Sequence, residues 1–84
     1  MRVGTQFTGS LNPGQSGRWF TFNWPPAWHV TWYMMPTTLK PGAPQLEWEV
    51  DVERASTTGA TYWLTVRNLS NAPLNFEGRY AVLN

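Results

Sequence analysis

Residues 46–53 alternate between apolar and acidic side chains without a break. In chain order they are Leu46, Glu47, Trp48, Glu49, Val50, Asp51, Val52 and Glu53. A period of two over this length predicts an extended strand with one dry face and one face in water. Such a strand is typical of an antiparallel sheet that covers a single core. We therefore expect the apolar side chains of this segment to be buried.

Shorter alternating segments occupy most of the remaining chain, and turns rich in Pro and Gly separate them. Besides 45–54, we expect strands at residues 5–8, 18–24, 28–35, 62–67 and 74–82. Residues 45–82 are expected to form a three-stranded antiparallel meander. No segment has helical spacing. The sequence therefore predicts an all-β fold, a small antiparallel β-sandwich of jelly-roll-like type with about six to eight short strands, in one domain over residues 1–84.

The core of so short a chain must depend on large side chains. A chain of 84 residues buries only about 60–65% of its unfolded surface. There is no Cys, so neither a disulfide nor a thiolate zinc site can reinforce the fold. The alternation predicts burial of Trp48, Val50, Leu64, Val66, Phe76 and Tyr80. Trp48→Ala should then cost about 3–5 kcal/mol of stability.

The charge of the chain bears on its partners and compartment. The net charge is +1, and only 13% of residues are charged. Nucleic acid requires a basic surface, so we expect no nucleic-acid partner. No apolar run approaches the roughly 18 residues of a membrane span, and the N-terminal residues lack an apolar signal region. The sequence is compatible with a cytosolic protein and with a secreted chain whose leader has been removed.

One segment carries a family resemblance. Residues 7–16 read Phe-Thr-Gly-Ser-Leu-Asn-Pro-Gly-Gln-Ser, and Arg-Trp-Phe-Thr-Phe follows at 18–22. This segment resembles the opening of bacterial pre-peptidase C-terminal domains, and residues 61–68 are similar to a late strand of such domains. Gln15 and Ser16 stand where the family usually has an acidic residue. The resemblance implies a small secreted β-sandwich, of the kind likened to carbohydrate-binding modules.

No constellation typical of an enzyme is visible. His29 is the single histidine, whereas a hydrolytic triad or a zinc site needs further partners. The acidic side chains of 47–53 point the same way from one strand, whereas glycoside hydrolysis needs two carboxylates across a cleft. We expect no catalysis, no cofactor and no metal. The acidic row is instead expected to pair with the next strand, with Arg67 beside Glu47 or Glu49.

Several aromatic side chains fall on the face opposite to the expected core. In residues 18–24 the alternation separates Trp19 from Phe20, Phe22 and Trp24, which we assign to the core face. We predict a contact surface made of Trp19, His29, Tyr33, Trp63 and Arg67. Such a surface can stack on sugar rings or pack against a second subunit. A third alternative is that these residues face the second sheet, which would reverse part of the assignment.

The sequence thus favours a non-catalytic, lectin-like binding module for carbohydrate that acts as a homo-oligomer. Self-association is expected because 42% of residues are hydrophobic, six are Trp, and few charges keep copies apart. Association would also multiply weak sugar sites. The alternative is a structural, self-assembling protein whose aromatic surface makes subunit contacts.

Overall fold

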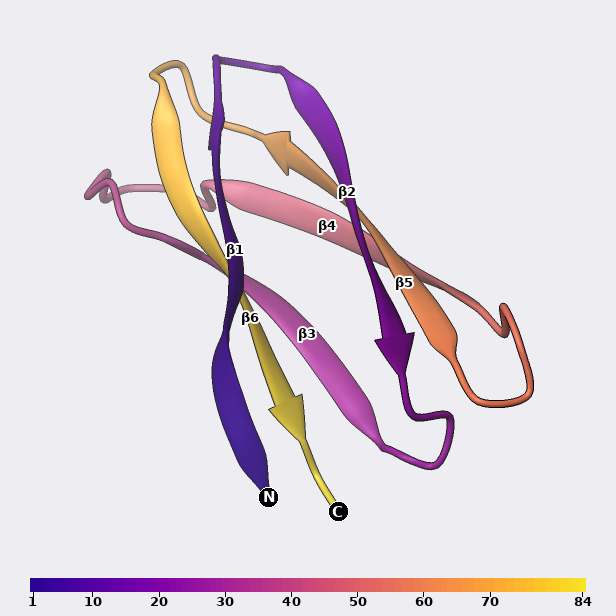
Figure 1. Cartoon of the computed structure of the whole chain (residues 1–84). Coiled ribbons are helices and arrows are strands. Elements are labelled where there is room, and N and C mark those ends of the chain that lie inside the picture. Colours follow the sequence, from indigo (N-terminus) through magenta and orange to yellow (C-terminus); the bar gives the residue numbers. More distant parts are fainter.

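The computed structural model describes residues 1–84 and contains six strands and no helix (Figure 1). The strands are β1 (Arg2–Leu11), β2 (Ser16–Trp24), β3 (Val30–Pro36), β4 (Leu46–Glu53), β5 (Ala60–Asn68) and β6 (Leu74–Val82). They form two antiparallel sheets: sheet A, in the order β1-β6-β3, and sheet B, in the order β2-β5-β4. The predicted all-β class is confirmed.

A two-stranded ribbon runs through both sheets: one of its strands is β1 followed by β2, and the other is β5 followed by β6. β1 pairs with β6 in sheet A, and β2 pairs with β5 in sheet B. Where the ribbon passes from one sheet to the other, the Gly14 amide donates to the Asn68 carbonyl (3.1 Å) and the Asn68 amide donates to the Gln15 carbonyl (3.0 Å). The ribbon therefore stays hydrogen-bonded through the crossing, as expected for a jelly-roll-like wrapping.

The side chain of Asn68 holds this crossing in place. Asn68 is fully buried. Its Nδ2 donates to the carbonyl oxygens of Leu11 (3.0 Å) and Ala72 (2.9 Å), and its Oδ1 accepts from the amide of Ser70 (2.8 Å). These bonds turn residues 68–73 out of sheet B, so β6 lies in sheet A. The predicted meander over 45–82 is therefore wrong: β4 and β5 form a hairpin, but β6 does not continue it.

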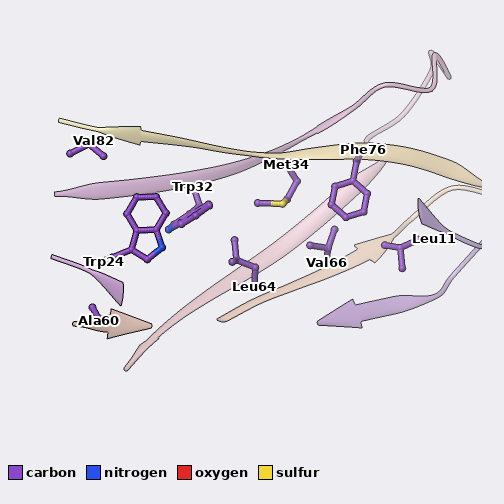
Figure 2. Packing of buried hydrophobic residues seen from close by; sticks show 9 residues of the cluster. All are labelled: Leu11, Trp24, Trp32, Met34, Ala60, Leu64, Val66, Phe76 and Val82. Carbon is purple, nitrogen blue, oxygen red and sulfur yellow. The ribbon is translucent and has the colours of Figure 1, made fainter. Parts of the chain in front are cut away.

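The core lies between the sheets, which supply it from both sides (Figure 2). It consists of Leu11, Trp24, Trp32, Met34, Ala60, Leu64, Val66, Phe76 and Val82. In Figure 2, Phe76 points from β6 toward Leu64 and Val66 of β5. The predicted burial of Leu64, Val66 and Phe76 is confirmed. Tyr80 is only half-buried and packs against the cluster.

The face assignment of β2 is wrong for three of its four aromatic residues. Trp19 packs against the core, whereas Phe20 and Phe22 are exposed. The pairing with β5 shifts between Thr21 and Trp24, where Asn23 has a φ of 65°. Such a bulge changes which face the next residue takes. Only Trp24 reaches the core as predicted.

The side of the sandwich formed by β1 and β2, the closed side, is sealed by aromatic packing. Phe7 stacks on Trp19 with ring centroids 5.7 Å apart, and Trp19 meets Phe76 edge to face at 5.2 Å. Glycines make room for these rings. A Cβ on Gly17 would lie 2.6 Å from the Trp19 ring, and a Cβ on Gly78 would overlap the ring of Phe7. The absence of a side chain at position 78 therefore leaves the space that the Phe7 ring fills.

The side formed by β3 and β4, the open side, is not sealed. In β4, 37% of Trp48, 41% of Val50 and 65% of Val52 remain exposed. Their partners on β5 include the buried Val66 and Leu64, so these β4 residues do share the core face. Figures 1 and 2 show β3 and β4 diverging toward the β4–β5 hairpin. The predicted burial of Trp48 and Val50 is wrong because sheet A covers this edge strand only at its beginning, where Leu46 packs against the core.

Candidate functional site

The outer face of sheet B carries the main concentration of exposed aromatic and charged side chains. Strand register places its residues in three columns. β2 contributes Ser16, Arg18 and Phe20, followed by the exposed Phe22 in its bulge; β5 contributes Arg67, Thr65 and Trp63; β4 contributes Glu47, Glu49, Asp51 and Glu53. Every member is aromatic, charged or hydroxylated, so the face combines apolar contact area with hydrogen-bonding groups.

Three of these side chains form an aromatic row across β2 and β5. Phe20 stacks on Trp63 with ring centroids 5.0 Å apart, and Phe22 stacks on Phe20 at 6.2 Å, each with an interplanar angle of 30°. Phe20 is 58% exposed and Phe22 is 62% exposed. Rings that support one another in this way lose little conformational freedom when a ligand contacts them. The aromatic row of Phe20, Phe22 and Trp63 is therefore a preformed apolar surface.

Charged groups flank the aromatic row on both sides. The guanidinium carbon of Arg18 lies 4.6 Å from the centroid of the Trp63 ring. The Nε1 of Trp63 donates to the Glu53 carboxylate at 3.2 Å. Asp51 lies directly opposite Trp63 in the register and makes no side-chain hydrogen bond or ion pair. The row thus has a cation on one side and a free acceptor on the other.

The other end of this face is hollowed. A depression of about 250 Å³ is lined by residues of all three strands: Ser16, Glu47, Trp48, Glu49, Thr65 and Arg67. Within it, Arg67 lies 3.7 Å from Glu47, both well exposed. The predicted pairing of Arg67 with this acidic row is confirmed. Glu49 makes no ion pair, so it remains free to accept a hydrogen bond.

The five predicted contact residues do not form one surface. Trp63 and Arg67 lie on the outer face of sheet B. Trp19, by contrast, packs against the core. His29 is exposed in the connection before β3, where its amide donates to the Asn84 side chain. Tyr33 lies on the outer face of sheet A, opposite Arg79, whose pKa is raised by hydrogen bonds to Tyr33 and Glu77.

Phe20 and Phe22 are the surface residues that the alternation missed. Positions 19, 20, 22 and 24 are all aromatic, so alternation alone cannot choose which face of this strand is dry. One local signal was present. Asn tolerates the left-handed conformation that a bulge requires, and Asn23 stands directly before Trp24.

The other hollows of the surface are not lined by exposed aromatic side chains. A hollow of about 370 Å³ lies among residues 40–45 and 69–71, where the loop before β4 meets the turn before β6. No group of three or more His, Asp or Glu side chains is placed to hold a metal ion. No helix suited to crossing a membrane is present.

Comparison with known proteins finds no match among protein-family models, curated proteins or solved structures. The resemblance to pre-peptidase C-terminal domains therefore stays a prediction.

Proposed function

We propose that this chain is a non-catalytic carbohydrate-binding module whose binding face is the outer face of sheet B. One observation carries the proposal: Phe20 and Phe22 are exposed and stack in a row with the partly exposed Trp63, beside free carboxylates in register on β4. Sugars present apolar C–H faces and a rim of hydroxyl groups. A surface that is apolar at its centre with a few placed polar groups suits such a ligand.

The polar groups have complementary roles. Asp51 and Glu49 can accept hydrogen bonds; Asp51 lies directly opposite Trp63, and Glu49 lies two residues further along β4, opposite Thr65. Arg18 donates only, and it lies on the β2 side of Trp63. The hydroxyl groups of a sugar ring that stacks on Trp63 would therefore meet acceptors on the β4 side and a donor on the β2 side. Hydroxyl groups both donate and accept, so they use both sides.

The alternative is self-assembly through the same face. Exposed apolar area of this kind serves subunit contacts as readily as ligands. A homo-oligomer formed elsewhere on the surface would be compatible with sugar binding and would add avidity. An oligomer formed through the aromatic row would hide it. Sedimentation measures the mass in solution and so separates the cases. If sugar binding is the function, both the wild type and Phe22→Ala should sediment as oligomers of the 9.6 kDa chain.

The direct test is a glycan array followed by titration of the strongest ligand, with Trp fluorescence as the signal. Trp63→Ala should abolish binding. Phe22→Ala should weaken it by roughly tenfold, which corresponds to about 1.4 kcal/mol. Tyr33→Ala is the matched control, since it removes a similar exposed ring from the other sheet.

Thermal melts confirm that each variant is folded before binding is compared. A protein that binds no glycan, or a Tyr33→Ala variant that loses as much affinity as Phe22→Ala, contradicts the proposal. If Phe22→Ala becomes monomeric while the wild type is an oligomer, the self-assembly alternative is the correct one.

A further inference from the structure

The four edge strands of the sandwich differ in how well they could accept an additional strand. β1 has a register shift between Thr5 and Phe7, and β2 has one between Thr21 and Trp24. β4 pairs only with β5, in an unbroken register from Leu46 to Glu53. Bulges discourage edge-to-edge pairing, whereas a regular edge presents a row of unpaired backbone donors and acceptors. β4 is therefore a suitable template for strand addition.

The fourth edge strand, β3, is regular but offers little apolar surface on its core face. Its core-facing side chains Trp32 and Met34 are already buried. The corresponding side chains of β4 are uncovered: Trp48, Val50 and Val52 increase in exposure along the strand. A strand added beside β4 would lay its own apolar side chains next to these three. Only on β4 does a free backbone edge coincide with an uncovered core face.

The acidic outer face of β4 favours an added strand with basic side chains on the same face. Glu49 and Asp51 have no cationic partner. The existing neighbour, β5, shows the complementary pattern: it sets Arg67, Thr65 and Trp63 against the acidic side chains and Val66, Leu64 and Tyr62 against the apolar ones. Opposite charges directly across two strands stabilise their pairing, and like charges destabilise it.

We propose that the free edge of β4 binds an extended segment of a protein partner in which basic and apolar side chains alternate. Backbone hydrogen bonds hold the segment, Trp48, Val50 and Val52 receive its apolar side chains, and Glu49 and Asp51 receive its basic ones. A second copy of β4 is a poor occupant. An antiparallel pair of β4 strands would place two sets of four carboxylates on one face. The site lies beside the aromatic row of β2 and β5, and it shares Glu49 and Asp51 with the proposed sugar-binding face.

The test uses the whole chain and a blocked eight-residue peptide in which lysine alternates with valine. A peptide of the same composition with its lysines clustered is the first control, and an alternating glutamate–valine peptide is the second. Calorimetry measures affinity, and hydrogen exchange locates the site. We expect the alternating lysine peptide to bind at least tenfold more tightly than either control. We also expect it to slow exchange of β4 amides without slowing those of β1, β2 or β3.

Charge reversal supplies the sharper readout. Asp51→Lys should weaken binding of the lysine peptide at least tenfold and strengthen binding of the glutamate peptide. Glu77→Lys is the matched control: it makes the same change of charge on the outer face of sheet A and should alter neither affinity. Melting curves confirm that both variants are folded. A third variant, Val50→Lys, tests the apolar side and should abolish binding.

Three results would overturn the proposal. The first is equal affinity for the alternating and clustered lysine peptides, which indicates charge attraction without strand pairing. The second is peptide binding that leaves the β4 amides unprotected. The third is protection of β4 that grows with protein concentration in the absence of peptide, which identifies a second copy as the occupant.

Discussion

The closed and open sides of the sandwich each have a tryptophan on the core face, yet only one of these side chains is well packed. On the closed side, Trp19 stacks on Phe7 of the opposite sheet and meets Phe76 edge to face. On the open side, Trp48 has no aromatic neighbour and remains partly exposed. The difference lies in what faces each tryptophan from the other sheet.

The connections explain why one side closes. β1 and β2 are joined by a tight turn in which the Gln15 amide donates to the Asn12 carbonyl at 3.0 Å, and side chains connect them further along, where Gln6 Nε2 donates to Thr21 Oγ1 at 3.1 Å. β3 and β4 are joined by residues 37–45, which include Pro41 and Pro44. A loop of this length imposes little constraint on the strands it joins. The two edges are free to diverge, and the β4 side chains lose their cover.

The largest expected effect is on the closed side. Trp19→Ala removes a ring that contacts both sheets, and it should lower the free energy of unfolding by about 3–5 kcal/mol. Urea denaturation followed by far-UV circular dichroism measures this. A domain of this size has only about 5–10 kcal/mol to lose, so the variant should be close to unfolding at 37 °C. A loss below about 1 kcal/mol would show that Phe7 and Trp19 do not seal this side.

A second prediction tests the fit of the same side. Gly78→Ala places a methyl group where the Phe7 ring lies. Overpacking of this kind should cost about 1–3 kcal/mol. The double variant Phe7→Leu/Gly78→Ala gives the control, because a smaller side chain at 7 relieves the overlap. The cost of Gly78→Ala should therefore be smaller in the Phe7→Leu background, and purely additive costs would contradict the described contact.

The contrast between the two sides also explains which features the sequence could predict. The alternation in 46–53 correctly predicted a strand and its pairing of Glu47 with Arg67, because both depend on local periodicity and on one hairpin. It could not predict the exposure of Trp48, since cover comes from a strand of the other sheet. Burial is decided by contacts between residues far apart in the sequence, and periodicity reports only which residues share a face.

Two further differences between the prediction and the structure also come from contacts between residues far apart in the sequence. In β2 both Trp19 and Phe20 are aromatic, so the choice of the buried residue depends on pairing with β5 and on the bulge at Asn23. The crossing of β6 to sheet A depends on Asn68, whose side chain bonds to the distant carbonyl of Leu11. The residues that follow Asn68 resemble an ordinary turn, so the sequence gives no sign of this bond. The candidate face was therefore predicted at Trp63 and Arg67 and missed at Phe20 and Phe22.

A smaller effect is expected on the open side. Trp48→Ala should cost about 1–2 kcal/mol, less than the 3–5 kcal/mol expected for a buried tryptophan, because part of the ring is already in water. The same urea experiment compares its free energy of unfolding with that of Trp19→Ala. If the two variants are equally destabilised, the open side is covered in solution, and concentration-dependent melting would then identify a second copy as the cover.

The smallest effect is expected from the ion pair that joins β4 to β5 on the open side. The Arg67–Glu47 pair joins β4 to β5 across the outer face, but both side chains are more than half exposed and the charged atoms are 3.7 Å apart. Exposed pairs of this kind contribute about 0.2–1 kcal/mol, so Glu47→Gln should lower the free energy of unfolding by no more than that. The difference from the wild type should shrink further in 0.5 M salt, where exposed charges are screened. The matched variant is Glu49→Gln, which removes the neighbouring carboxylate that has no ion pair and should be neutral or slightly stabilising. A loss above about 2 kcal/mol for Glu47→Gln that persists in salt would mean that the pair is desolvated, and therefore that something covers this face of β4 in solution.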